Sequence, residues 1–328
     1  MIRIRASLAC LMTTFALALT VMPARGAVLT GFAAMGASET QGTNFNGSWV
    51  PWLVTDRGLN FGPSQTYNRA VGGSTTTTLL SGGQHTQVAN LVHAGSVDMA
   101  FLFIGGLDVP PVATNILGGT LNVPVWASGV VSRITTAMDT VLAQHPDGMV
   151  VAGLPDMRLV PGGLSLAAPE LTVAIIDAID VVNAQLKSAA LSRGLAYIDV
   201  ASAMQDLYYG GLTVGGVPIN MTVGSSNPRN FFADDIHPGY VGNGYFANLM
   251  ATALNVGYGQ SIPKFTDQAI LTRAGLLSSY TGETSNINYA QYIYTATVPE
   301  PSTSVLLFIG GISAGGIWLR RNRKALVG

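Results

Sequence analysis

The chain contains, at residues 97–104, the run Val97-Asp98-Met99-Ala100-Phe101-Leu102-Phe103-Ile104, which ends at Gly105-Gly106. A short apolar run bounded by glycine is typical of a strand buried on both faces of a parallel sheet. Further strands are predicted at residues 28–37, 149–154 and 195–200, and one more at residues 66–71, which Gly72-Gly73 closes. We expect these runs to form the central sheet of the domain.

Helical patterns lie between the predicted strands. They cover residues 49–58, 75–93, 122–143 and 169–192, and a late apolar run extends from Tyr245 to Leu254. Strands that alternate with helices of ten or more residues predict a parallel sheet with helices on both faces, the three-layer α/β/α class. Functional residues in such a sheet lie at the carboxyl ends of the strands, where Ser38, Gly73 and Gly106 are expected.

The N-terminus has the pattern of a secretory signal peptide over residues 1–26. Arg3 and Arg5 precede an apolar segment at residues 8–22, and Ala24-Arg25-Gly26 offers small residues at a cleavage site. A permanent anchor is the alternative, but the apolar segment is short and ends at Pro23. The one cysteine, Cys10, lies inside this leader, so we expect neither lipidation nor a disulfide framework in the mature chain.

The C-terminus carries a second sorting pattern at residues 298–328. Val298-Pro299-Glu300-Pro301-Ser302 precedes an apolar run at residues 305–319, and four basic residues follow it. At ~1.5 Å per residue this run is short for a ~30 Å hydrocarbon core. The pattern resembles the bacterial PEP-CTERM signal, which implies a transient inner-membrane anchor that an exosortase removes. A plain tail anchor is the alternative.

Removal of both ends changes the charge of the protein. The full chain has 16 basic and 17 acidic residues. Seven of the basic residues and one acidic residue lie in the two ends, so the mature chain has 9 basic and 16 acidic residues and a net charge near −7. An acidic protein without a basic cluster argues against nucleic-acid binding and against polyanionic substrates.

A candidate catalytic turn lies at Phe232-Ala233-Asp234-Asp235-Ile236-His237-Pro238-Gly239. A carboxylate three residues before a histidine can hold one ring nitrogen and leave the other free as a base. A surface turn without function is one alternative, and a metal site at Asp234, Asp235 and His237 is another. Asp98 and Asp108, which flank the strand at 97–104, are predicted to hydrogen-bond neighbouring loops.

Four sequence blocks together resemble the SGNH (GDSL) esterase and lipase family. They are Gly36-Ala37-Ser38, Asn68-Arg69-Ala70-Val71-Gly72-Gly73, Ile104-Gly105-Gly106-Leu107-Asp108 and Asp234-Asp235-Ile236-His237-Pro238. The blocks occur in the family's order and at its spacings, over residues 28–254. The resemblance implies a flavodoxin-like α/β/α domain, placed at residues 27–262, with residues 263–297 as a domain-edge segment and spacer.

The resemblance also assigns catalytic roles without a cofactor or a metal. Ser38 would be the nucleophile, His237 its base and Asp234 the acid that orients the imidazole. The backbone N–H groups of Ser38 and Gly73 would form the oxyanion hole. These roles imply hydrolysis of a carboxylic ester through an acyl-serine intermediate, on acylated extracellular polysaccharide or on short-chain lipid esters.

The sequence departs from the family pattern in two blocks. Glu39 stands where the family usually has leucine, which leaves the serine in place. Leu107 stands where the family has the asparagine whose side chain is the third oxyanion donor, and such a loss typically costs about 10²–10³ in rate. Asn115 or Asn122 would be a replacement donor. The alternative function is therefore a secreted surface or matrix protein that keeps the fold and binds glycan or ester without useful turnover.

Overall fold

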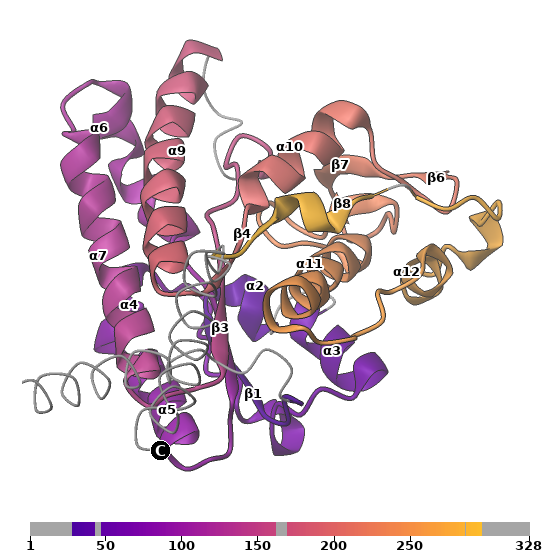
Figure 1. The fold of residues 1–328 in the computed structure, drawn as a ribbon. Helices are drawn as coiled ribbons and strands as arrows, with labels where there is room; N and C mark the ends of the chain where they lie inside the picture. Colours follow the sequence, from indigo (N-terminus) through magenta and orange to yellow (C-terminus); the bar gives the residue numbers. More distant parts are fainter. Residues whose placement is uncertain (1–27, 43–46, 162–168, 286, 297–328) are drawn as a thin grey trace, which may run out of the picture. The chain divides into compact units, whose positions relative to one another are not determined.

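A five-stranded sheet forms the centre of the molecule (Figure 1). The computed structural model describes residues 28–42, 47–161, 169–285 and 287–296. The strand order is β1-β2-β3-β4-β9, with bounds β1 (Phe32–Gly36), β2 (Met99–Phe103), β3 (Gly148–Ala152), β4 (Ala196–Ile198) and β9 (Ile293–Tyr294). The first four strands run parallel, every residue in them is buried, and β9 pairs antiparallel with β4.

Helices cover both faces of this sheet, which confirms the predicted three-layer α/β/α class (Figure 1). One layer consists of α4 (Thr76–Ser81), α5 (Gln84–His93), α6 (Ala113–Leu117), α7 (Val123–Leu142) and α9 (Pro169–Ser192). In the other layer α11 (Tyr240–Tyr258) packs on β3, β4 and α3 (Trp49–Arg57), and α12 (Asp267–Arg273) packs on α11. The remaining elements are α2 (Ser38–Gln41), α10 (Val200–Gly210), β5 (Thr213–Val214), β6 (Val217–Pro218), β7 (Asn220–Val223) and β8 (Asn230–Phe232).

The helix α7 forms where the sequence supplies a cap and an apolar stripe. Asn122 caps α7 by accepting a hydrogen bond from the Val125 amide, and the buried residues of α7 recur at helical spacing from Ala127 to Val141. The middle of α11 is buried on all sides, from Val241 to Leu254. A helix that is buried all round requires cover on both flanks, and the sheet and α3 provide it.

Two predicted elements differ from the structure. The predicted helix at 75–93 is split, because Gly83 takes a left-handed conformation (φ 71°) between α4 and α5. The predicted strand at 66–71 forms no ladder beyond one bridge, between Asn68 and Ala34. Its backbone follows the free edge of β1 through the hydrogen bonds from Arg69 N to Ala34 O and from Val71 N to Gly36 O. The prediction of a regular strand was wrong because the segment turns at Asn68, whose Oδ1 accepts from the Ala70 amide, and only one bridge to β1 forms.

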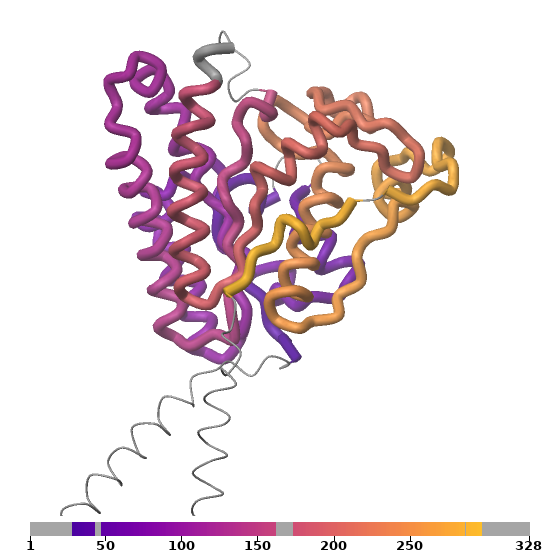
Figure 2. The backbone as a smooth tube through the Cα atoms, turned by 45° about the horizontal axis from the view of Figure 1, so that its top comes forward, coloured from indigo at the N-terminus to yellow at the C-terminus, as the bar shows by residue number. Residues whose placement is uncertain are grey.

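The compact unit that contains the sheet extends to Thr295. Figure 2 shows the last described segment returning to the sheet, where β9 pairs with β4. The segment from residue 263 onward therefore contributes α12 and a strand to the same unit. Among the described residues, no helix combines the length and the apolar character needed to cross a membrane. The predicted signal peptide and sorting segment lie outside the described residues.

Candidate active site

Ser38 lies at the carboxyl end of β1, as the first residue of the short helix α2. The chain enters this turn through Gly36, where a Cβ atom would lie 2.2 Å from the Phe103 carbonyl oxygen. Only glycine fits there, and the turn after it places Ser38 at the surface of a pocket. In the described part of the chain, neither the amide nor the hydroxyl of Ser38 has a hydrogen-bond partner.

The loop that carries Gly73 is fastened to α2 by side chains. Asn68 donates to the Thr40 carbonyl oxygen (2.8 Å), and Gln41 accepts from the Gly72 amide (2.7 Å). Gly73 itself has a φ of 78°, a conformation that favours glycine. Its amide has no partner among the described residues and is free to bind a ligand.

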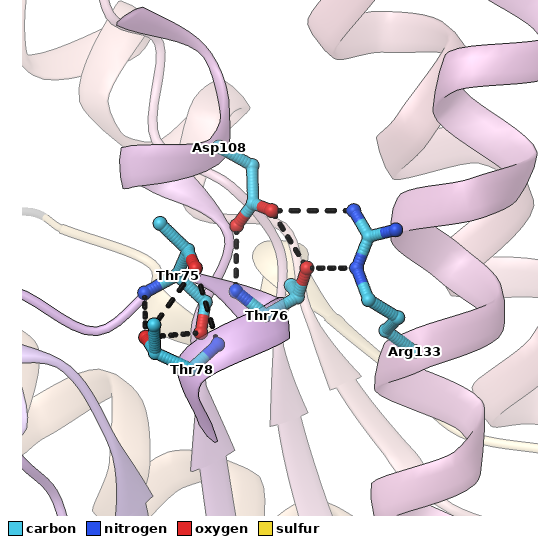
Figure 3. Close-up of polar contacts among 5 residues, drawn as sticks. All are labelled: Thr75, Thr76, Thr78, Asp108 and Arg133. Carbon is cyan, nitrogen blue, oxygen red and sulfur yellow. Dashed lines mark hydrogen bonds and ion pairs between the residues drawn. The ribbon is translucent and has the colours of Figure 1, made fainter. Parts of the chain in front are cut away.

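A buried carboxylate joins this loop to the turn at residues 106–108 (Figure 3). Asp108 accepts hydrogen bonds from the amide and the hydroxyl of Thr76, at 2.8 and 2.6 Å. Arg133 of α7 donates to Asp108 at 3.3 Å and to the Thr76 hydroxyl at 2.7 Å. The predicted role of Asp108 as a loop-holding residue is confirmed. So is that of Asp98, which accepts from Thr30 and Gly31.

Asp234 and His237 are in direct contact in the turn between β8 and α11. The ring Nδ1 of His237 lies 2.9 Å from Oδ1 and 2.7 Å from Oδ2 of Asp234. Oδ1 also accepts from the amides of Ile236 (2.9 Å) and His237 (2.7 Å). This network assigns the proton of a neutral ring to Nδ1 and leaves Nε2 as the basic nitrogen. Nε2 is buried and has no hydrogen-bond partner among the described residues.

The same contacts set the ionisation of Asp234. Partial burial alone would raise the pKa of its carboxyl group. Hydrogen bonds from the Ile236 amide and from the ring and amide of His237 outweigh that effect, so the pKa lies below its usual value. Asp234 is therefore ionised at neutral pH. The neighbouring Asp235 is exposed and binds nothing in the described part, so Asp234 is the acid that faces the ring.

One pocket is lined by residues from three of the four predicted blocks; Gly73 and the rest of the second block do not line it, and neither does the ring of His237. Ser38 and Leu107 line it, as do Ile236 and Pro238, the two neighbours of His237. No hydrogen bond joins Ser38 Oγ to His237 Nε2 in this structure. Such contacts are often long before substrate binds and shorten in the complex. The described residues hold no group of three His, Cys, Asp or Glu side chains that fits a metal ion.

Comparison with known proteins places the chain in a family. The model of the GDSL-like lipase/acylhydrolase family matches residues 34–245. The chain belongs to this family. Similar solved structures include an extracellular lipase from Streptomyces rimosus (18% identity, 77% of this chain and 100% of that chain, TM-score 0.41), a lipase from a goat rumen metagenome (14%, 70% and 99%, TM-score 0.46) and a family 3 carbohydrate esterase from Clostridium thermocellum (17%, 70% and 98%, TM-score 0.38). At such low identity the likeness concerns the fold alone. No curated protein matches the chain.

Two residues of this chain, Leu107 and Glu39, differ from the usual pattern of the GDSL family. Leu107 lines the pocket with an apolar side chain, and neither Asn115 nor Asn122 lines it. The Asn122 side chain is already engaged as the cap of α7. Sequence reasoning missed Glu39, whose carboxyl group also lines the pocket. The only signal was its position directly after the candidate nucleophile.

Proposed function

We propose that the protein is a secreted serine esterase that hydrolyses carboxylic esters through an acyl group on Ser38. The observation that supports this proposal most directly is the contact of 2.7 Å between the Asp234 carboxylate and the Nδ1 atom of His237, beside the pocket that Ser38 lines. In a neutral ring this contact holds the proton on Nδ1, so the buried Nε2 is the nitrogen that can act as a general base.

The proposed reaction proceeds in two halves. Ser38 Oγ attacks the ester carbonyl while its proton passes to His237 Nε2, and the ionised Asp234 stabilises the resulting imidazolium. The amides of Ser38 and Gly73 bind the oxyanion. The leaving alcohol then takes the proton from His237, and water, activated by the same nitrogen, hydrolyses the acyl-serine.

The pocket favours a short acyl group. Apart from Ser38 and Glu39, its lining consists of apolar side chains and one glycine, among them Phe103, Met157 and Met204. Its cavity volume is about 80 Å³, which is small beside the ~300–1,000 Å³ of sites for drug-sized ligands. An O-acyl group on extracellular polysaccharide and a short-chain lipid ester both meet this requirement, because the alcohol part would remain outside the pocket.

A second function is supported by Leu107. An apolar residue at this position cannot donate to an oxyanion, so the alternative is a surface or matrix protein that binds glycan or ester without useful turnover. In both cases we propose export to the cell surface or medium of a Gram-negative-type bacterium, with a transient anchor at residues 305–319 that an exosortase removes. The sequence patterns at the two ends support this route.

Hydrolysis of short-chain chromogenic esters by the purified protein tests the proposal. Turnover should disappear in Ser38→Ala and persist in Ser226→Ala, an exposed serine outside the pocket. If the wild type is folded and as inert as Ser38→Ala across acyl lengths, the esterase proposal fails. Glycan binding that is unaffected by Ser38→Ala would then favour the second function.

A further inference from the structure

Glu39 is the one ionisable side chain that lines the pocket. Of the lining residues within the described ranges, only Ser38 and Glu39 have polar side chains. Glu39 follows Ser38 directly in α2 and is partly buried. A carboxyl group among apolar side chains is costly to maintain in its ionised form. Its presence beside the candidate nucleophile therefore suggests a function.

The backbone contacts of Glu39 place its carboxyl group beside the predicted oxyanion site. The carboxyl group lies near enough to the amides of Ala37 and of Glu39 itself for both to lower its pKa. These two amides flank the Ser38 amide in the chain, and the Ser38 amide is a proposed oxyanion donor. The carboxyl group consequently lies next to the point where negative charge would develop.

Burial raises the pKa of this carboxyl group so far that much of it is still protonated near neutral pH. Desolvation raises the pKa of Glu39 to about 7, against the opposing effect of the two backbone amides. A protonated carboxyl group has one oxygen that can keep accepting from the backbone and one O–H that can donate. A neutral carboxylic acid in an apolar site is an effective oxyanion donor.

Among the described residues that line the pocket, no side chain other than those of Ser38 and Glu39 can donate a hydrogen bond to an oxyanion. Leu107 lines the same pocket and has no polar atom, and the free amides near Ser38 come from the backbone alone. A site with only two donors would be expected to lose about 10²–10³ in rate relative to one with three. A carboxylic acid at position 39 would restore the third donor.

We propose that Glu39 is a further catalytic residue, whose protonated carboxyl group donates a hydrogen bond to the oxyanion that forms at Ser38. The inference rests on the proposed esterase function and adds a residue to its oxyanion site. The Glu39 proton stays on the carboxyl group throughout, while the Ser38 proton moves to His237 and then to the leaving alcohol. Ionisation of Glu39 removes the donor and places a negative charge beside the oxyanion.

The surroundings make Glu39 the group that limits activity at alkaline pH. Other charged side chains on the lining segments are held by their own partners or exposed: Asp108, Asp156, Arg158, Asp234 and Asp235. None of them contributes to the shift at Glu39. His237, the candidate base, must be neutral to accept the Ser38 proton. Activity should therefore fall above about pH 7, as Glu39 ionises.

The test measures the kcat and KM of three variants of the full protein from pH 5 to 9. Two are the single variants Glu39→Gln and Glu39→Leu, and the third is a double variant that combines Glu39→Leu with Leu107→Asn. The substrate is 4-nitrophenyl acetate, and Glu283→Gln, an exposed carboxyl group outside this pocket, is the matched control. Circular dichroism and urea unfolding establish that each variant is folded. We expect Glu39→Leu to lower kcat by about 10²–10³ at pH 6, with KM little changed.

The other two variants distinguish donation from packing. Glu39→Gln should keep kcat within tenfold and lose the alkaline decline, because an amide donates but does not ionise. Leu107→Asn should recover at least tenfold of the rate lost in Glu39→Leu. Wild-type kcat in Glu39→Leu, or an unchanged alkaline decline in Glu39→Gln, overturns the inference and leaves the esterase proposal intact. Activity that survives Ser38→Ala overturns the esterase proposal, and the role of Glu39 with it.

Discussion

Replacement of Asp234 by asparagine should lower kcat by about 10³ and leave KM nearly unchanged. The Asp234 carboxylate lies 2.7 Å from Nδ1 of His237. In the proposed mechanism it stabilises the imidazolium that forms as Ser38 attacks. For charge centres ~4 Å apart at an effective dielectric constant of ~20, the attraction is about 4 kcal/mol. Since each 1.36 kcal/mol is a factor of ten, its loss corresponds to about 10³ in rate.

The Asp234→Asn exchange should change which nitrogen of the His237 ring carries the proton and leave the backbone hydrogen bonds of the turn intact. Oδ1 of Asp234 also accepts from the amides of Ile236 and His237, and the Oδ1 atom of asparagine can keep both hydrogen bonds. The asparagine NH₂ group would then face Nδ1, so the ring would carry its proton on Nε2. A protonated Nε2 cannot accept the Ser38 proton, which adds to the electrostatic loss.

Steady-state hydrolysis of a short-chain chromogenic ester measures the effect, with Asp235→Asn as the matched control. Asp235 is adjacent and exposed, and it binds nothing in the described part of the chain, so its exchange should change kcat by less than twofold. The reasoning is refuted if Asp234→Asn stays within tenfold of wild type while Ser38→Ala is inactive. An equal loss in Asp235→Asn would refute the assignment of Asp234.

Two further predictions concern stability. Asp108→Ala should lower the free energy of unfolding by about 3 kcal/mol, because three hydrogen bonds from Thr76 and Arg133 lose their acceptor; a change below 1 kcal/mol in urea unfolding would contradict this. Glu39 has a pKa raised from 4.5 to about 7 in the folded protein, so the folded state binds more protons between these values. The free energy of unfolding should therefore fall as pH rises from about 4.5 to 7. The decrease should be about 1–3 kcal/mol, because the group is partly hydrated. Glu39→Gln should abolish this contribution to the pH dependence of stability.

The main strands could be predicted because their environment is uniform. β1, β2, β3 and β4 are buried on both faces, so their sequences are continuous apolar runs that a simple pattern identifies. The segment at 66–71 has the same kind of glycine boundary but a polar centre. Its Asn68 side chain accepts from the Ala70 amide in a local turn, and only the three-dimensional structure shows that the pairing with β1 is limited to one bridge.

The candidate catalytic residues divide in the same way. Asp234 and His237 are three residues apart, so their contact follows from local geometry and could be expected from the sequence. The environment of Glu39 depends on side chains that are distant in the chain, such as Phe103 and Met204, and no local pattern contains it.

The two departures from the family pattern lie in one pocket, and they are opposite in character. Position 107 has an apolar residue where an amide is usual, and position 39 has a carboxyl group where an apolar residue is usual. Considered separately, the first removes an oxyanion donor and the second adds a buried acid. When the two are considered together, the donor that is missing at position 107 is replaced by a donor at position 39 of the same pocket. With the proposed donor at position 39, Leu107 alone is no evidence for an inactive protein.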